Sequence, residues 1–266
     1  MIISGLIGRP VTHSIGQLVY NRIFKDLKMD AIYMSFDIIK ENLGIFCKYA
    51  AENMAGFNVT APYKNDIIKY TNSVDSISLK TGSVNLVRVL DNRLYGYNSD
   101  YAGFIKTMDE NNIELKNKRI LISGTGGIAR TVFNAIKDKN VNADVSFLSR
   151  SGRKPWIPEN INVYNYNNVK DDYDILINCT PLGTYPDNSI AFPDNIIKKV
   201  TGIDVVYNPV RTRFLSIVES NGGRAVNGVD LFTGQGVETL RLIFNIDLDY
   251  NDFKLYVLKA LSDINE

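Results

Sequence analysis

Histidine and cysteine are nearly absent from this chain of 266 residues, which contains one histidine, His13, and two cysteines, Cys47 and Cys179. A single histidine excludes a histidine-rich metal site, and any Ser-His-Asp or Cys-His scheme would have to use His13. Two thiols far apart in apolar runs argue against a disulfide framework and suit a reducing compartment. Proton transfer at a catalytic site would therefore fall to lysine, aspartate, glutamate or tyrosine.

Long apolar runs are also lacking, because no stretch approaches the length needed to span a bilayer. The opening residues, MIISGLIGRP, lack the basic start and long apolar core of a signal peptide. The 30 Lys+Arg balance 29 Asp+Glu, and a net charge of +1 provides no general attraction to nucleic acid or anionic membranes. We therefore expect a cytoplasmic protein with neither a nucleic-acid nor a membrane partner.

Short apolar runs alternate with helical patterns along the whole chain, which is typical of α/β proteins. The length suits two modest domains or one large one. Asp91 and Asn92 predict a hairpin turn, and apolar runs without alternation after residue 119 favour a parallel sheet covered on both faces. The predicted strands are 2–7, 31–36, 56–59, 84–90, 94–97, 119–123, 145–148, 163–166, 175–178 and 203–206, and helical periodicity marks 19–27, 43–51, 128–139 and 236–264.

Gly124, Gly126 and Ala129 fit the pattern G-x-G-x-x-A between a predicted strand and a predicted helix. The first glycine permits a tight turn, the second lets the backbone approach a pyrophosphate, and the small third residue lets the helix pack closely. A structural turn is the alternative. The strand-to-helix context favours a dinucleotide, whose phosphates the helix N-terminus would bind.

The residues after the next predicted strand indicate which dinucleotide binds. An acidic residue there would accept hydrogen bonds from an adenosine 2′-hydroxyl and repel a 2′-phosphate. This chain instead has the sequence SRSGRK at 149–154, with three cations and two hydroxyls that suit a phosphate dianion. A solvated basic loop is the alternative interpretation, and the position of the segment favours NADP over NAD.

Three motifs in the first hundred residues lie at the ends of predicted strands, where open α/β sheets bind ligands. They are GRPVTHS at 8–14, NVTAPYK at 58–64, and GSVN at 82–85 followed by GYNSD at 96–100. Together they offer hydroxyls, amides, one lysine and one carboxylate, which suits a small polyhydroxylated acid. Taken singly, Lys64 could be a surface lysine and Asp100 could cap a helix.

The ordered set of motifs resembles the shikimate dehydrogenase family over nearly the whole chain. Besides the motifs above, it includes GTGGIAR at 124–130, NCTPLG at 178–183, VYNP at 206–209 and the segment 228–235. The resemblance implies an α/β fold with an N-terminal α/β substrate-binding domain, 1–100, and a Rossmann-type NADP-binding domain, 101–236. C-terminal helices at 237–266 would return to the first domain. The implied protein is a monomer or homodimer.

The family reaction is the reversible, NADP-linked reduction of 3-dehydroshikimate to shikimate, a step of chorismate and aromatic amino acid biosynthesis. The resemblance makes Lys64 and Asp100 the catalytic pair, with no metal. Substrate contacts would come from Ser14, Thr60, Asn85, Asp100, Tyr207 and Gln235. Cofactor contacts would come from Gly124, Thr125, Gly126, Gly127, Ile128, Ala129, Ser149, Arg150, Ser151, Arg153, Lys154, Thr180, Val205 and Gly228.

Three residues depart from the family pattern on the substrate side. Gly16 stands where a second serine usually faces the substrate carboxylate, Leu86 replaces a usual threonine, and Tyr101 replaces a usual glycine. Quinate or an aminated shikimate is therefore an alternative substrate. A non-catalytic binding or regulatory module on the same scaffold is a second alternative, and another two-domain dehydrogenase, such as one acting on a folate, is a third.

Overall fold

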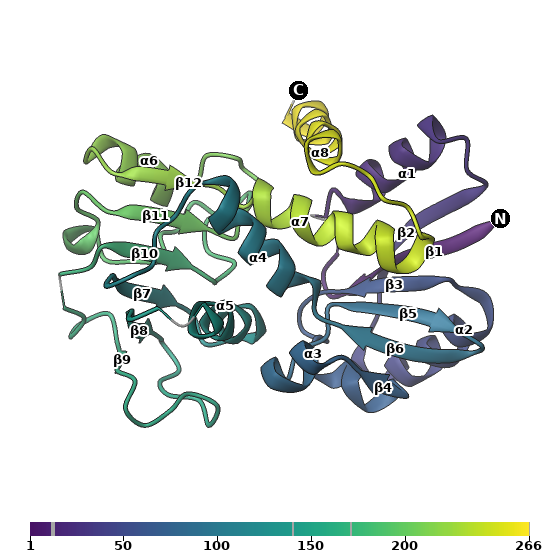
Figure 1. Cartoon of the computed structure of the whole chain (residues 1–266), viewed down its shortest axis with the longest axis horizontal. Helices are drawn as coiled ribbons and strands as arrows, with labels where there is room; N and C mark the ends of the chain where they lie inside the picture. Colours follow the sequence, from purple (N-terminus) through teal and green to yellow (C-terminus); the bar gives the residue numbers. More distant parts are fainter. Residues whose placement is uncertain (12–13, 140, 171, 266) are drawn as a thin grey trace. The chain divides into compact units, whose positions relative to one another are not determined.

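The computed structural model describes residues 1–11, 14–139, 141–170 and 172–265 (Figure 1). The chain forms two compact units, one comprising Met1–Gly103 with the chain from Thr233 on, and the other Phe104–Phe232. The breaks fall inside the helices α4 (Ser99–Glu110) and α7 (Val229–Thr239). Among the described residues, no helix combines the length and the apolar character that crossing a membrane requires.

The first unit is built on a six-stranded mixed sheet in the order β2-β1-β3-β5-β6-β4. Its strands are β1 (Ile2–Gly8), β2 (Ala31–Asp37), β3 (Gly56–Val59), β4 (Ser73–Val74), β5 (Leu86–Leu90) and β6 (Arg93–Tyr97). β1, β2 and β3 are parallel, and β5 runs antiparallel to both β3 and β6. Asp91 and Asn92 join β5 to β6, which confirms the predicted hairpin. Both residues have positive φ, as in the two-residue turns whose twist matches that of the paired strands.

The edge strand β2 is covered by amide side chains from α1 (Gly16–Asp26). Asn21 Nδ2 donates to the Tyr33 carbonyl at 2.9 Å, and Asn21 Oδ1 accepts from the Tyr33 N–H at 2.8 Å. Gln17 Oε1 accepts from the Ser35 N–H at 3.1 Å. These contacts occupy backbone groups through which an exposed edge would otherwise pair with another chain.

Helices cover both faces of this sheet. α2 (Leu43–Asn53) packs Leu43, Cys47 and Ala50 into an apolar core with the strands. The C-terminal segment is interrupted, because α7 passes into a π-helical turn, Leu240–Phe244, which ends at a left-handed Asn245 before α8 (Tyr250–Asn265). α8 lies beside α1, where Tyr256 donates to Asp26 (Figure 1). The remaining helical elements are η1 (Lys40–Asn42), η2 (Asp66–Tyr70) and α3 (Ser76–Thr81).

The second unit is built on a fully parallel six-stranded sheet in the order β12-β11-β10-β7-β8-β9. Its strands are β7 (Arg119–Ser123), β8 (Asp144–Leu148), β9 (Val163–Tyr164), β10 (Ile175–Asn178), β11 (Thr201–Asp204) and β12 (Arg224–Val226). Strand order reverses beside β7, the point at which doubly wound sheets bind ligands. α5 (Gly127–Asp138) and α6 (Arg213–Ser220) belong to this unit, together with η3 (Asp194–Ile196).

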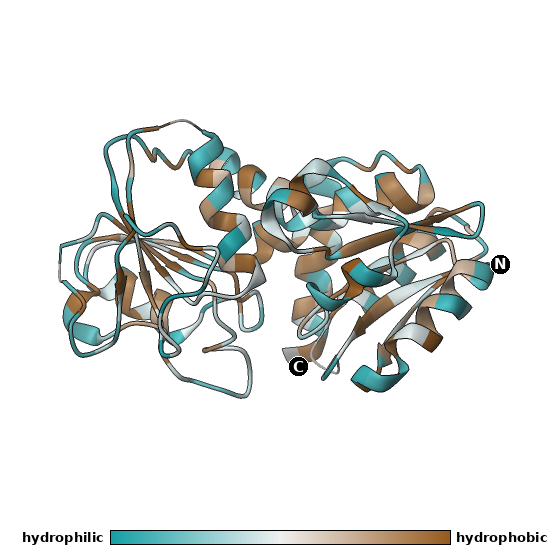
Figure 2. Cartoon of the chain, turned by 90° about the horizontal axis from the view of Figure 1, so that it is seen from below, coloured by the Kyte–Doolittle hydropathy of each residue, from teal (hydrophilic) through white to brown (hydrophobic). Residues whose placement is uncertain are grey.

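The apolar strands predicted from the sequence form the centres of both sheets, and they are drawn largely in brown in Figure 2. Two predicted strands end two residues early. Asp204 accepts from the Val206 N–H, and Asn165 accepts from the Asn167 and Asn168 N–H groups. Each side chain thus takes backbone donors away from the strand ladder and begins a turn.

Candidate active site

The predicted substrate residues of the first unit gather at one edge of its sheet. The carboxyl ends of β1, β3 and β6 share this edge with the start of β5, because β5 is antiparallel to its neighbours. Thr60 and Lys64 follow β3, Asn85 precedes β5, and Asp100 follows β6. The Lys64 carbonyl accepts from the Val84 N–H at 2.8 Å, which fixes the lysine beside the Asn85 segment.

Lys64 and Asp100 form a direct ion pair. Lys64 Nζ donates to Asp100 Oδ2 at 2.5 Å, and the side chains are 21% and 4% exposed. Asp100 does not cap its helix, because Asn98 Oδ1 accepts the Tyr101 N–H at 3.3 Å. The carboxylate is therefore available to hold the ammonium group, whose partly exposed position leaves it accessible to a small molecule.

Asn85 connects the ion pair to α7. Its Oδ1 accepts from the backbone N–H of Ser99 at 2.7 Å and from the Ser99 hydroxyl at 3.1 Å. Its Nδ2 donates to Gln235 Oε1 at 3.3 Å. Three predicted site residues, Asn85, Asp100 and Gln235, are thus brought into one region of the first unit.

The β1 loop carries Ser14, whose Oγ accepts the Gly16 N–H at 3.2 Å. A Cβ at Gly16 would lie 3.2 Å from Ser14 Oγ and 3.5 Å from the Tyr33 ring. At Gly8, a Cβ would lie 2.3 Å from the Thr60 methyl group, so a glycine is needed for β1 to pass Thr60. Thr12 and His13, two further polar residues of this motif, lie outside the described residues.

The predicted glycine turn follows β7 in the second unit. Gly124 has φ +98°, and a Cβ there would lie 3.0 Å from Thr180 Cγ2 and 3.1 Å from the Cys179 carbonyl oxygen. A Cβ at Gly126 would meet no atom of the described chain within 4 Å. α5 begins with Gly127, and its first turn carries no acidic side chain. The turn therefore combines open space with a helix N-terminus that attracts anions.

The segment after β8 contacts the glycine turn through a row of hydroxyls. Thr125 Oγ1 lies 3.3 Å from Ser149 Oγ, which lies 3.4 Å from Ser151 Oγ. Arg150 is exposed and Lys154 is half-buried. Arg153 instead donates to the carbonyls of Ile157, Pro158 and Ile161, so its guanidinium fixes the following loop while its charge stays in this basic segment.

A buried pair that we did not predict from the sequence joins the ends of β10 and β11. Asn178 Nδ2 donates to Asp204 Oδ1 at 2.9 Å, and Asn178 Oδ1 accepts from the Thr180 hydroxyl and N–H. Asp204 also accepts from the Val206 N–H and the Thr212 hydroxyl. The sequence signal that could have indicated the pair is a polar residue at the end of each of two apolar strands, Asn178 in β10 and Asp204 in β11. The pair shapes the loops that carry Thr180 and Val205.

Two other predicted residues of this unit, Tyr207 and Gly228, follow β11 and β12. A Cβ at Gly228 would lie 2.4 Å from the Val205 carbonyl oxygen, so a glycine permits this close approach. The Tyr207 ring packs on Phe232, with centroids 4.8 Å apart. All the predicted cofactor residues therefore follow carboxyl ends of the parallel strands, as in dinucleotide-binding sheets.

Burial raises the pKa of Asp204 from 3.8 to about 6, although its hydrogen bonds oppose the shift. The folded state therefore binds this proton more tightly than the unfolded state does. We expect Asp204 to increase the free energy of unfolding by about 2 kcal/mol as pH falls from 6 to 4. In urea titrations, the free energy of unfolding of wild type minus that of Asp204→Asn should change across this pH range. A constant difference would contradict the assignment.

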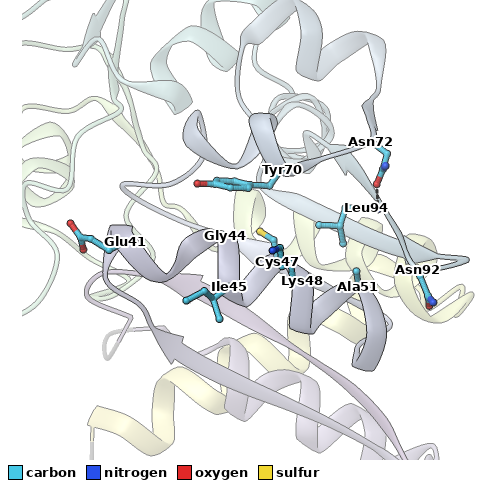
Figure 3. Close-up of a pocket in the computed structure, with 10 residues that line it drawn as sticks. All are labelled: Glu41, Gly44, Ile45, Cys47, Lys48, Ala51, Tyr70, Asn72, Asn92 and Leu94. Atoms are coloured by element: carbon cyan, nitrogen blue, oxygen red, sulfur yellow. Dashed lines mark hydrogen bonds between the residues drawn. The ribbon is translucent and has the colours of Figure 1, made fainter.

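A separate pocket of about 450 Å³ lies over α2 and contains none of these residues (Figure 3). Its lining residues are Glu41, Gly44, Ile45, Cys47, Lys48, Ala51, Tyr70, Asn72, Asn92 and Leu94. Burial raises the pKa of the Cys47 thiol to about 12, so the reactive thiolate form is suppressed. Among the described residues, no group of three or more His, Cys, Asp or Glu could hold a metal ion.

A Rossmann-type sheet with a glycine turn, together with a second α/β unit that carries a Lys–Asp pair, defines a dinucleotide-dependent dehydrogenase. The substrate-binding domain model of shikimate dehydrogenase matches residues 6–87. An NADP(+) shikimate dehydrogenase of Thermoplasma acidophilum is 42% identical over 99% of this chain and 98% of its own. One of Clostridium beijerinckii is 34% identical over 92% and 93%.

A solved shikimate dehydrogenase in complex with NADP+ superposes with a TM-score of 0.88 at 26% identity, covering 98% of this chain and 96% of that one. The chain belongs to the shikimate dehydrogenase family. The family resemblance and the fold class predicted from the sequence are thereby confirmed.

Proposed function

We propose that this chain is an NADP-dependent shikimate dehydrogenase, an oxidoreductase that reversibly reduces 3-dehydroshikimate to shikimate. The full-length relationship at 42% identity supports this activity. The Lys64–Asp100 ion pair is the structural observation that carries it, because a binding module would need no such proton-transfer pair. The reaction belongs to chorismate and aromatic amino acid biosynthesis.

Lys64 acts on the ketone oxygen. Reduction adds a hydride to the carbonyl carbon and a proton to its oxygen, and NADPH supplies the hydride when it is bound. As negative charge develops on the oxygen, the Lys64 ammonium group stabilises it and donates the proton. In the reverse direction the neutral amine accepts the proton of the alcohol, so Lys64 serves as both acid and base.

Asp100 holds this ammonium group in place and accepts a hydrogen bond from a substrate hydroxyl. Its carboxylate is 4% exposed and contacts Lys64 Nζ directly. Ser14, Thr60, Asn85, Gln235 and Tyr207 provide the further substrate contacts in this proposal. Hydroxyl and amide groups suit a ring with several hydroxyls and one carboxylate because each can donate or accept as required.

The residues of the second unit fit NADP. The glycine turn and the α5 N-terminus would hold the pyrophosphate through Gly124, Thr125, Gly126, Gly127, Ile128 and Ala129. Ser149, Arg150, Ser151 and Lys154 would bind the 2′-phosphate, with charge support from Arg153. Thr180, Val205 and Gly228 would complete the site. The open space at Gly126 and the hydroxyl row beside it are the structural features that favour this fit.

Arg150→Ala tests the choice of NADP. We expect the KM for NADP+ to rise about tenfold and the KM for NAD+ to stay within about twofold, since the proposed partner of the guanidinium is the 2′-phosphate, which NAD+ lacks. Steady-state rates with each cofactor measure this. Lys116→Ala, at an exposed lysine before the amino end of β7, is the control. An equal effect on both cofactors would contradict the assignment.

Gly16 supports an alternative substrate, because a glycine offers no side-chain hydroxyl at the position two residues after Ser14. Losing one hydrogen bond to a carboxylate costs about 1.5–3 kcal/mol unless water or backbone replaces it. Steady-state assays with shikimate, quinate and an aminated shikimate, each with both cofactors, decide the substrate. We expect the highest kcat/KM with shikimate and NADP+. Turnover of quinate without turnover of shikimate would overturn the proposal.

A further inference from the structure

A buried hydroxyl at the end of α7 joins several elements of the first unit. Thr239 is fully buried and immediately precedes the π-helical turn. Its Oγ1 donates to the Gln235 carbonyl at 3.0 Å and accepts from Asn58 Nδ2 at 3.0 Å. It also shares a hydrogen bond with the phenol of Tyr20, which is itself buried. The threonine hydroxyl is therefore the meeting point of α7, β3 and α1.

The partner Asn58 is held at both ends of its amide. Asn58 Oδ1 accepts from the Tyr33 hydroxyl at 2.8 Å, while its Nδ2 donates to Thr239. The rings of Tyr33 and Tyr20 stack with centroids 4.4 Å apart. Burial also raises the pKa of the Tyr20 phenol, so its proton stays in place. Because these groups are neutral and interlocked, the position of the Thr239 hydroxyl is tightly defined.

The position of Gln235 depends on this junction. Thr239 bonds to the backbone of Gln235, one helical turn earlier, and the Gln235 side chain accepts from Asn85. Asn85 in turn accepts from the N–H and the hydroxyl of Ser99, which directly precedes Asp100. The junction thus lies at one end of a series of hydrogen-bonded neutral residues that ends at Ser99, the residue before Asp100.

We propose that Thr239 is a positioning residue, which anchors the end of α7 to Asn58 and thereby places the Gln235 amide for the substrate. Thr239 is fully buried and acts through Gln235 without touching the substrate itself. The inference rests on the proposed function, in which Gln235 is a substrate contact.

Thr239→Val tests this role, because valine keeps the shape and removes the hydroxyl. We expect the KM for shikimate to rise about tenfold while the KM for NADP+ stays within about twofold. Thr239→Ser, which restores the hydroxyl, should return the KM for shikimate to within about twofold of wild type. The control is Ser4→Ala, which removes another buried hydroxyl of this unit. Ser4 lies near the amino end of β1, and its hydroxyl donates to the Ile32 carbonyl of β2. This substitution should leave both KM values within about twofold of wild type.

A double-mutant cycle separates positioning from a general loss of structure. Gln235→Ala should raise the KM for shikimate by itself, and adding Thr239→Val should then change it by less than about twofold. Tyr33→Phe removes the hydroxyl that donates to Asn58 Oδ1. It should raise the KM for shikimate about threefold when it is the only substitution, and should leave this KM unchanged when it is added to Gln235→Ala. This variant keeps the test decisive if Thr239→Val fails to fold.

Three results would overturn the inference. They are an unchanged KM in Thr239→Val, a full effect of that substitution in the Gln235→Ala background, and an equal rise in both KM values. Failure of the proposed function looks different, because wild type would then show no turnover of shikimate.

Discussion

Lys64→Ala lowers kcat for shikimate oxidation about a thousandfold, which is the scale of losing a positioned general acid–base group. The substitution removes the group that accepts the alcohol proton and that stabilises the developing charge on the oxygen. It also leaves Asp100, 4% exposed, without the ammonium group that it contacts at 2.5 Å. NADP+ binding should persist, because its proposed ligands belong to the other unit. Steady-state rates and a fluorescence titration with NADPH measure both quantities.

Lys40→Ala is the matched control for this result. Lys40 also pairs with an aspartate in the first unit, at 2.8 Å from Asp66, and its side chain is 66% exposed. Its loss should change kcat by less than about twofold, since surface ion pairs contribute little. A Lys64→Ala variant that retains more than about a tenth of wild-type kcat would rule out Lys64 as the main acid–base group.

Gly124→Ala raises the KM for NADP+ about fiftyfold, equivalent to about 2.3 kcal/mol of binding free energy. Two effects act together at this position. The backbone has φ +98°, a region that side chains with a Cβ rarely adopt, and the new methyl group would press on Thr180 and the Cys179 carbonyl. Relief of this contact moves the turn or the Thr180 loop, which both belong to the proposed cofactor site.

Gly222→Ala separates these two effects, because Gly222 also has a positive φ, +72°, with no atom of the described chain within 4 Å of the new Cβ. It lies in the turn between α6 and β12. We expect a loss of stability of about 1–2 kcal/mol and a KM for NADP+ within about twofold of wild type. Comparable KM values for Gly124→Ala and wild type would contradict a role of the turn in cofactor binding.

Much of the candidate site could be predicted because its residues belong to short motifs that follow predicted strands. The glycine turn lies between a short apolar strand and a helix, and the Lys64 and Asp100 motifs each follow a strand of the first sheet. The carboxyl ends of parallel strands meet at one edge of the sheet, so motifs that are far apart in the sequence lie close together there. The pairing of Lys64 with Asp100 follows from this edge and from the antiparallel β5 between their strands.

The polar junctions could not be predicted, because they depend on register across strands and helices. Asn178 meets Asp204 because β10 and β11 pair with these two residues opposite one another. Thr239 meets Asn58 across 181 residues of sequence. Helical periodicity in the C-terminal segment likewise gave no sign of the break at Asn245, where the backbone becomes left-handed. That Arg153 binds the cofactor stays a prediction, and its charge gave no indication that Nη1 and Nη2 donate to the carbonyls of Pro158 and Ile161.

Formation of NADPH from shikimate is the most direct test of the account. Purified wild-type protein should increase the NADPH absorbance when mixed with shikimate and NADP+ at alkaline pH, which favours proton loss from the alcohol. The increase should require all three components. If both ligands bind and no NADPH forms, the chain is a binding module and the catalytic role assigned to Lys64 and Asp100 is wrong.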